Sequence, residues 1–510
     1  MAVGPVGVPP GAGTVRSTVP QRLDRLPWSG FHWRVVIALG ITWVLDGIEI
    51  TIAGSIADRL RDQHTLGLSS SQVGLTASIY LFGEVVGALV FGRLADRLGR
   101  RRLFIVTLGI YLLGNALTAL SPAFAFFAVT RFIAGTGIGG EYAALNSAID
   151  ELIPSRHRGH ADLAVNATYW LGAMIGAASN LLFLNPGLFA LDTGWRIGLL
   201  VGPAIGVAIW GLRRNLPESP RWLLTHGRPE EAEQVVAGIE RAVERTGVRL
   251  EPVADSLAVE YRQRPPVGYR ELARILFRDY RRRSVLGFML MVTQSFLYNA
   301  IFFTYALILA EFYGIRDGAV AYFIFPFAVG NLVGPLVLGR YFDSLGRRRM
   351  IGTTYCLSGA LLLVTGWLFA AGLLSALTQT LLWCVIFFIA SAAASSAYLT
   401  VSEIFPVEMR AQAISFFFAL SMLFGGVVAP WLFATLIGAG HDPWRVCAGY
   451  AAGGVLMVLG GLTAFRWGVD AERRPLEEVA VPLSASVRAA GGSAAPAPAH
   501  GVRPTRRTRW

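Results

Sequence analysis

Twelve long apolar segments constrain the fold of this 510-residue chain more than any other feature. A helix needs about 20 mostly apolar residues to cross the hydrocarbon core of a bilayer. Segments of about that length lie at 34–56, 72–94, 103–120, 124–148, 161–184, 195–213, 284–310, 318–341, 350–371, 376–401, 412–437 and 445–467. The sequence therefore predicts an all-α membrane protein with twelve transmembrane helices.

Three motifs occur twice, and the two copies lie about 250 residues apart, which indicates an internal duplication. GRLADRLGRRR at 92–102 returns as GRYFDSLGRRR at 339–349, and ELIPSRHR from Glu151 returns as EIFPVEMR from Glu403. The third pair is Trp195-Arg196 and Trp444-Arg445. The duplication predicts two pseudo-symmetric six-helix bundles, formed by residues 34–213 and 284–468, an arrangement that many transporters share.

Three polar segments lie outside these bundles: residues 1–33, a linker of residues 214–283 and a tail of residues 469–510. Residues 1–33 lack the apolar stretch and cleavage site of a signal peptide, so the first helix is expected to act as its own insertion signal. Within the linker, the run from Glu230 to Arg245 has the composition and spacing of a helix. The tail is rich in Ala, Pro, Gly and Arg without apolar periodicity, and we expect it to be disordered.

The distribution of arginine predicts the orientation in the membrane, because short cytoplasmic loops are enriched in positive charge. Arginine concentrates in the connections that follow the second, fourth, eighth and tenth helices. These residues are Arg97, Arg100, Arg101, Arg102, Arg156, Arg158, Arg347, Arg348, Arg349 and Arg410. Both termini and the linker are therefore expected in the cytoplasm, with the bundles spanning the cell membrane.

Composition excludes several other classes of protein. The net charge of +12 does not indicate nucleic-acid binding, because the arginines lie in short loops between apolar segments. Cys356, Cys384 and Cys447 fall inside apolar segments, with neither a disulfide framework nor metal-ligand spacing. No nucleophile with a neighbouring base stands out, so we expect no enzyme and no cofactor. The expected partners are a small-molecule substrate, protons and the lipid bilayer, and the expected oligomeric state is a monomer.

The repeated loop motif places an aspartate four residues before the first arginine of each cluster. Asp96 precedes Arg100, and Asp343 precedes Arg347. One interpretation is a simple positive-inside anchor, which explains the arginines but not the aspartates. The other is a gate, in which the acid pairs with arginine or with a helix N-terminus in one conformation only. We favour the gate because the spacing recurs in both halves.

From these motifs, residues 30–468 resemble the major facilitator superfamily, whose signature is the duplicated G-x-x-x-D-x-x-G-R-R-R loop. The closest resemblance is to the sugar porters and related metabolite–proton symporters. PESPRW at 217–222, RFIAGTGIGGE at 131–141 and SEIFP at 402–406 resemble motifs of that branch.

The resemblance implies that loop arginines pair with glutamates at the inner ends of the fourth and tenth helices and lock the outward-facing state. Which arginine meets which glutamate is left open by the sequence. The gating residues implied are Asp96, Arg100, Arg101, Glu151, Asp343, Arg347, Arg348, Glu403 and Arg410.

Ionisable groups inside the membrane normally mark a pathway. Asp46 lies about 12 residues, or roughly 18 Å, into the first span from the cytoplasm, and Arg131 lies about 8 residues into the fourth span from outside. In a core of about 30 Å the two meet near mid-membrane, so we predict an Asp46–Arg131 pair that carries the proton. A permanent ion pair that only fixes helix packing is the alternative. Glu49, one turn from Asp46, could share the proton or contact substrate.

Two further buried acids are expected along these helices. Glu84 lies among small residues of the second span, where a packing role is favoured. Glu141 lies near the inner end of the fourth span, where structural and functional roles are equally expected.

Polar residues of the seventh span predict a substrate pocket. Gln294 and Asn299 supply neutral donors and acceptors and resemble the QQ-x-x-G-x-N motif of sugar porters, although Thr293 and Leu297 replace its first Gln and its Gly. Asn166 stands where that family usually has Gln, and Tyr398 stands in place of a Trp. These departures weaken a hexose assignment. Without the resemblance, Gln294 and Asn299 could equally form hydrogen bonds between helices.

The combined interpretation is a proton-coupled uptake carrier for a sugar, polyol or carboxylate, including aromatic acids, that works by alternating access. An exporter of drugs or metabolites shares the loop motif and is the alternative within transporters. A membrane sensor built on a transporter fold is the alternative from another class.

Overall fold

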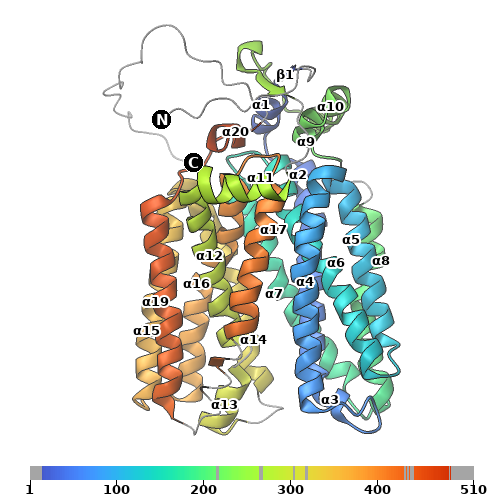
Figure 1. The fold of residues 1–510 in the computed structure, drawn as a ribbon, viewed down its shortest axis with the longest axis vertical. Coiled ribbons are helices and arrows are strands. Elements are labelled where there is room, and N and C mark those ends of the chain that lie inside the picture. Colours follow the sequence, from blue (N-terminus) through green and yellow to red (C-terminus); the bar gives the residue numbers. More distant parts are fainter. Residues whose placement is uncertain are drawn as a thin grey trace.

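The computed structural model describes residues 14–213, 217–262, 268–302, 305–315, 320–429, 432–433, 436, 442–481 and 483. Two bundles of long helices stand side by side, and a group of short elements lies across one end of them (Figure 1). We call that end the capped end. The first 13 residues of the N-terminal segment and the tail from residue 484 onward lie outside the described residues.

Six helices make the first bundle and six spans make the second. The first bundle contains α2 (Gly30–Ser55), α4 (Ser70–Leu98), α5 (Arg100–Ala119), α6 (Phe124–Leu152), α7 (Arg158–Phe183) and α8 (Leu191–Arg213). The second contains α12 (Arg281–Phe302) with α13 (Tyr305–Tyr313), α14 (Val320–Ser344), α15 (Arg347–Ala370), α16 (Ala376–Ile404), α17 (Arg410–Ser421) with the π-helical η3 (Met422–Val428), and α19 (Pro443–Trp467). The predicted twelve-helix, two-bundle fold is confirmed.

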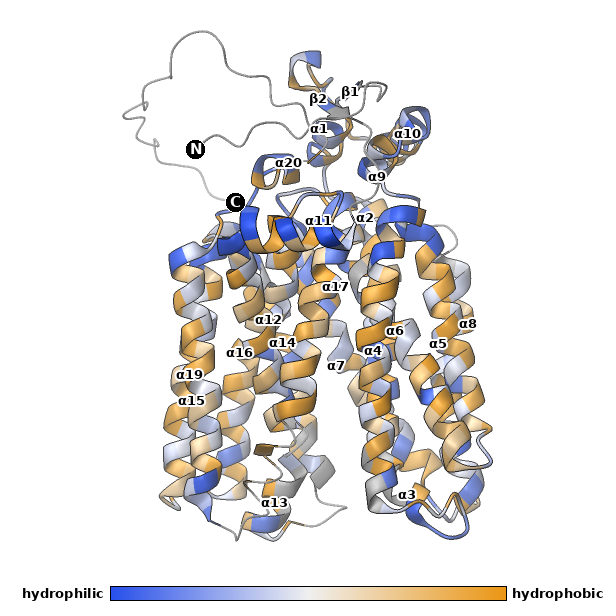
Figure 2. Ribbon diagram, in the orientation of Figure 1, coloured by the Kyte–Doolittle hydropathy of each residue, from blue (hydrophilic) through white to orange (hydrophobic). Residues whose placement is uncertain are grey.

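Hydropathy along the helices fits a bilayer. Apolar residues cover the bundles along their length, and polar residues gather at the ends (Figure 2). Within the described residues, nine helices are long and apolar enough to cross a membrane on composition alone. The remaining spans, α6, α7 and α14, are of similar length and carry buried polar groups such as Arg131, Asp162 and Asn331. Large apolar side chains such as Phe82, Leu113 and Val364 point outward, where lipid would cover them.

Small residues bring α4 and α6 into backbone contact. A Cβ atom added at Gly87 would lie 2.1 Å from the carbonyl oxygen of Thr136, and one at Gly139 would lie 2.1 Å from that of Glu84. Because only glycine permits this approach, the two helices pack without intervening side chains. The contact involves the backbone of residue 84, while the Glu84 side chain lines a cavity described below, so the packing role favoured from the sequence stays a prediction.

The two bundles meet through two pairs of helices. The helix α7 packs against α14, and α4 packs against α17. The helices α4 and α14 are the second spans of their halves, and α7 and α17 are the fifth. Each pair therefore joins a second span to a fifth span, as expected from the internal duplication of the sequence. Groups that end these helices therefore face the opposite bundle.

A small cap covers one end of the first bundle. It consists of α1 (Val19–Asp24), α9 (Pro220–Thr225), α10 (Pro229–Glu244) and a two-stranded antiparallel sheet of β1 (Thr14–Ser17) and β2 (Val259–Arg262). Its own apolar core includes Leu23, Trp222 and Val236. The helix predicted between Glu230 and Arg245 is confirmed as α10. Short elements η1 (Asp255–Leu257), α11 (Tyr269–Arg274) and η2 (Ile275–Asp279) complete the linker.

The expectation of a disordered tail is wrong for its first residues. The short helix α20 (Leu476–Val479) buries Leu476 and Val479. Glu477 accepts a hydrogen bond of 2.8 Å from Nε of Arg221 in α9. The sequence signal was weak because the segment is short and its buried apolar residues, such as Ala471, Leu476 and Val479, do not form a helical period.

Ion pairs fasten α1 to α10 inside the cap. Glu240 accepts hydrogen bonds from Arg22 (2.5 and 3.0 Å) and from Arg25 (2.5 Å). Partial burial alone would raise the pKa of Glu240, but the two guanidinium groups outweigh it and hold the pKa below its ordinary value. A depressed pKa means that this contribution to stability is present at neutral pH and is lost as pH falls through the folded-state value.

Glu240→Gln should loosen α1 from α10, because it removes the charge that both arginines share. We expect faster amide hydrogen exchange across α1 at neutral pH, with the transmembrane helices unchanged. Glu230→Gln, at an exposed position of the same helix, is the matched control. Equal exchange in the two variants would mean that apolar packing alone holds α1.

Candidate functional site

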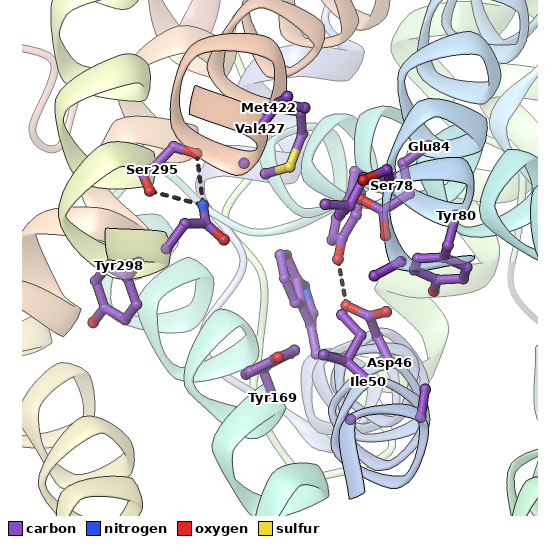
Figure 3. Close-up of a pocket in the computed structure, with 18 of the residues that line it drawn as sticks. Asp46, Ile50, Ser78, Tyr80, Glu84, Tyr169, Ser295, Tyr298, Met422 and Val427 are labelled. Carbon is purple, nitrogen blue, oxygen red and sulfur yellow. Dashed lines mark hydrogen bonds between the residues drawn. The ribbon is translucent and has the colours of Figure 1, made fainter. Parts of the chain in front are cut away.

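A cavity of about 570 Å³ lies between the two bundles. Its lining comes from α2, α4, α6 and α7 on one side and from α12, α16 and η3 on the other. Figure 3 shows Asp46, Tyr80 and Glu84 on one wall, with Ser295 and Tyr298 across from them. The lining extends to Leu60 and Val73, near the end of the bundles opposite the cap. The cavity therefore reaches toward the uncapped end.

All four predicted substrate residues line this cavity: Asn166, Gln294, Asn299 and Tyr398. The amide of Asn299 donates to the backbone oxygen of Ser295 (2.7 Å) and to its hydroxyl (3.1 Å). The amide of Asn166 donates to the backbone oxygen of Asp162 at 2.8 Å. Each amide group therefore bonds to a carbonyl oxygen one turn earlier in its own helix.

Aromatic rings form much of the wall, and the sequence reasoning missed most of them. Trp43 packs against Tyr142 and Tyr398, with ring centroids 4.7 and 6.0 Å apart, and Trp170 lies 6.0 Å from Tyr298. The sequence pointed to Tyr398 and to rings of the seventh span such as Tyr298, but not to Trp43, Tyr142 or Trp170. The available signal was the position of Trp43 three residues before Asp46, close to one helical turn away and thus near the same face.

The predicted Asp46–Arg131 pair is wrong: among the described residues, the guanidinium of Arg131 forms its ion pair with Glu49. Asp46 instead accepts a hydrogen bond from the hydroxyl of Tyr142 (Figure 3). The second carboxyl oxygen of Asp46 has no hydrogen-bond partner in the described structure. Glu49 and Asp46 stand about one turn apart on α2. The predicted membrane depth of Arg131 was therefore nearly right, but its acidic partner lies one turn further along the helix.

Buried acidic groups outnumber buried cations in the region around Asp46 and Arg131. Asp46, Glu49, Glu84 and Glu141 are all at most 2 % exposed. Arg131 is the one buried arginine at this level of the described bundles; its guanidinium also lies 4.0 Å from the ring centroid of Tyr80. The other buried arginines lie at the capped end: Arg100, Arg158, Arg221, Arg347 and Arg410. The guanidinium of Arg131 is paired with Glu49 and not with Asp46 or Glu84 in the described structure.

At the capped end, a sharp turn precedes the first arginine of each loop motif. Gly99 has φ of 93° and Gly346 has φ of 104°, values that other residues rarely adopt. Each turn folds the following arginine back into the protein. Arg100 then pairs with Asp96 (3.1 Å) and with Glu151 (3.0 Å).

The second half repeats this arrangement. Arg347 pairs with Asp343 at 2.7 Å and with Glu403 at 3.0 Å. The structure thereby answers which loop arginine meets which glutamate: in each half it is the first arginine of the cluster.

Further contacts cross from one bundle to the other. Asp96 accepts a hydrogen bond from the backbone N–H of Gln412 (3.1 Å) at the start of α17. Asp343 accepts from the backbone N–H groups of Gly159 (3.2 Å) and His160 (2.7 Å) at the start of α7. Each aspartate therefore caps a helix of the opposite bundle, where the helix dipole favours negative charge.

Two ion pairs join the bundles at the same level. Arg158 lies 3.5 Å from Glu403, and Arg410 lies 3.4 Å from Glu151. We call the whole set the capped-end network. Its members are Asp96, Arg100, Glu151, Arg158, Asp343, Arg347, Glu403 and Arg410. No member lines the described cavity, so the network closes the bundles between the cavity and the cap.

Two of the predicted gating residues lie at the edge of this network. Arg101 and Arg348 are exposed. The backbone N–H of Arg101 donates to Glu218 of the PESPRW motif (3.3 Å), and the side chain of Arg348 donates to the backbone oxygen of Phe465 (2.7 Å). Glu218 also accepts from the backbone N–H of Arg100 at 2.9 Å. Burial raises the pKa of Glu218, and these hydrogen bonds partly oppose that rise.

Comparison with known proteins agrees with this architecture. Residues 46–481 match the family described as Sugar (and other) transporter. The niacin transporter NiaP of Acinetobacter baylyi is 27% identical over 83% of this chain and 91% of its own length. The putative metabolite transport protein YdjK of Escherichia coli K12 is 28% identical over 87% of this chain and 91% of its own length.

Among solved structures, the proton:xylose symporter XylE bound to 6-bromo-6-deoxy-D-glucose superposes with a TM-score of 0.72 at 19% identity, covering 88% of this chain and 98% of that one. The inward-open conformation of XylE from E. coli covers 88% and 99% with a TM-score of 0.60. The chain belongs to the sugar transporter family of the major facilitator superfamily, and it is a multi-pass membrane transporter rather than an enzyme.

Proposed function

We propose that this transporter carries a small polar metabolite with a ring into the cell together with protons. The capped end faces the cytoplasm, both termini lie there, and the cavity receives substrate from outside. The observation that carries the proposal is that the buried acids Asp46 and Glu84 line the cavity, while the nearby guanidinium of Arg131 is paired with Glu49.

Charge balance supports proton binding at Asp46. Burying a carboxylate without a cation is costly, and a bound proton removes that cost. Glu49 already neutralises Arg131, so a proton is what would compensate Asp46 and Glu84. Asp46 lines the cavity and has one oxygen without a hydrogen-bond partner among the described residues, which suits a group that gains and loses a proton.

The loop charges and the cavity support the direction. Exposed arginines such as Arg101, Arg102, Arg348 and Arg349 gather at the capped end, as expected for a cytoplasmic face. The cavity extends toward the opposite end while the capped-end network joins the bundles. In alternating access, substrate and proton would enter this outward-facing state, and the network would then break so that the two bundles rock open toward the cytoplasm.

The lining supports a substrate with both an apolar ring and polar substituents. Aromatic rings offer stacking surfaces, while the side chains of Asn166, Gln294 and Asn299 offer neutral donors and acceptors. Aromatic acids, sugars and cyclic polyols combine a ring with polar substituents. Thermal-shift screening of the purified protein against these classes tests the proposal, since a true ligand stabilises the fold by mass action.

Asp46→Asn should abolish accumulation against a gradient while exchange of substrate continues, because the amide cannot exchange a proton. Proteoliposomes with an imposed pH gradient measure accumulation, and counterflow measures exchange. Asp255→Asn, at an exposed position of the linker, is the control and should behave as the parent protein. Undiminished accumulation in Asp46→Asn would remove Asp46 from proton coupling.

Gln294→Ala should raise the KM for the substrate about tenfold or more, as expected when a buried hydrogen-bond partner is lost. Initial rates of uptake measure this effect, and Gln234→Ala at an exposed position of α10 serves as the control. An unchanged KM would assign Gln294 to helix packing.

Glu403→Gln should favour opening of the capped end, because it weakens the pairs with Arg158 and Arg347. We expect the ratio of open to closed molecules to rise about tenfold or more, since a broken buried ion pair is strongly destabilising. Spin labels at Arg102→Cys and Arg349→Cys, with the three native cysteines replaced, report the distance between bundles by electron–electron double resonance. Glu230→Gln is the control, and identical distance distributions would show that Glu403 does not hold the gate.

A further inference from the structure

A buried carboxyl group lies between the cavity and the capped-end network, and the transport scheme above does not use it. Asp162 stands one turn into α7 and is 0 % exposed. One of its oxygens accepts a hydrogen bond from Nδ2 of Asn166 at 3.2 Å. The other oxygen has no hydrogen-bond partner within the described residues. Through Asn166, which lines the cavity, this acid touches the substrate site from its closed side.

The charged groups around Asp162 do not compensate a negative charge. Its electrostatic neighbours are Asp150 of α6, Asp343 of α14, Glu403 of α16 and Arg347 of α15. Three of these are acids. The fourth, Arg347, is already engaged by Asp343 and Glu403. Arg158 precedes Asp162 by one turn on α7, but its own ion-pair partners in the described structure are Asp24, Asp150 and Glu403.

We propose that Asp162 is a second proton-binding site, which holds a proton while the capped end is closed and releases it to cytoplasmic water when that end opens. In the closed state the side chain is dry, surrounded by acids and without a cation of its own, so the neutral acid is the form that fits. Opening separates α7 from α14 and α16 and admits water, which stabilises the carboxylate. The proton then leaves as hydronium, and the reverse occurs on closing.

The sign of the effect follows from linkage. A group that is protonated in the closed state and ionised in the open state favours opening as pH rises. Cytoplasmic alkalinity would therefore promote release of substrate, and an acidic cytoplasm would keep the gate shut. This inference rests on the proposed orientation and gate but not on proton coupling at Asp46. An experiment can therefore refute the role of Asp162 and leave the role of Asp46 standing, or the reverse.

The test uses the spin-label pair at positions 102 and 349 in the full-length protein, in nanodiscs, across mildly acidic to mildly alkaline pH. In the parent protein the open population should increase with pH. Asp162→Asn, which imitates the neutral acid, should lose most of that increase, whereas the control Asp255→Asn, at an exposed position of the linker, should retain it. A parent protein whose distances do not respond to pH, or an Asp162→Asn variant that responds as the parent does, would overturn the proposal.

A second variant keeps the test decisive if Asp162→Asn does not fold. Asn166→Leu removes the hydrogen bond to the carboxyl group, which stabilises the charged form more than the neutral form. The midpoint of opening should then move to higher pH, and a midpoint that stays or falls contradicts a proton site at Asp162. Infrared difference spectra of parent against Asp162→Asn at neutral pH give an independent readout. A protonated-carboxyl band in the closed state supports the proposal, and a carboxylate band there refutes it.

Discussion

The cost of placing charge in a dry, lipid-shielded interior governs every polar feature of this transporter. Each buried acid must find a cation, a helix N-terminus or a proton. Glu49 has Arg131, and Glu151 and Glu403 have arginines of both bundles. Asp96 and Asp343 each face an arginine and the start of a helix across the interface. Asp46 and Asp162 have neither a cation within ion-pair distance nor a helix start in the described structure, and protons are the remaining solution.

This division separates two kinds of acid by position. Apart from Glu49, the acids whose charge the protein compensates in this way lie where the bundles touch, so they can act as mechanical contacts. Acids that depend on a proton lie beside the cavity or directly beneath it. A transporter built this way links its conformation to proton concentration, because the number of bound protons differs between a dry and a wet interior.

Much of the fold could be predicted from the sequence, because the signals are long or repeated. Twenty-residue apolar segments define the spans, and the duplicated loop defines the two halves. The turn at Gly99 and Gly346 could also be inferred, since glycine followed by arginine recurs at the same spacing. The sequence predicted only the type of contact across the interface, namely that Asp96 and Asp343 pair with an arginine or with a helix N-terminus. The structure identifies the helices as α17 and α7.

The candidate site was less predictable. Depth estimates place Asp46 and Arg131 at similar levels, but they cannot distinguish two acids one turn apart, and the structure pairs Arg131 with Glu49. Likewise the ring cluster around Trp43 depends on how α2, α6 and α16 rotate about their axes, which apolar periodicity inside a membrane hardly constrains. Asp162 lies inside the predicted fifth span, but at its very end beside Arg158 and His160, where a polar residue of a span is expected to reach water; the structure buries it within α7.

The capping of helices across the interface has a consequence for how this protein can vary. The carboxyl group of Asp96 accepts a hydrogen bond from the backbone N–H of residue 412, so this bond does not depend on the side chain at that position. At residue 159 the equivalent contact leaves no room for a side chain, because a Cβ atom would lie 2.3 Å from the Arg347 side chain and 2.7 Å from the Asp343 side chain. The two quasi-equivalent halves of the gate therefore differ in what the capping hydrogen bond itself demands, because at residue 159 it leaves room for glycine alone, whereas at residue 412 it accommodates a buried glutamine.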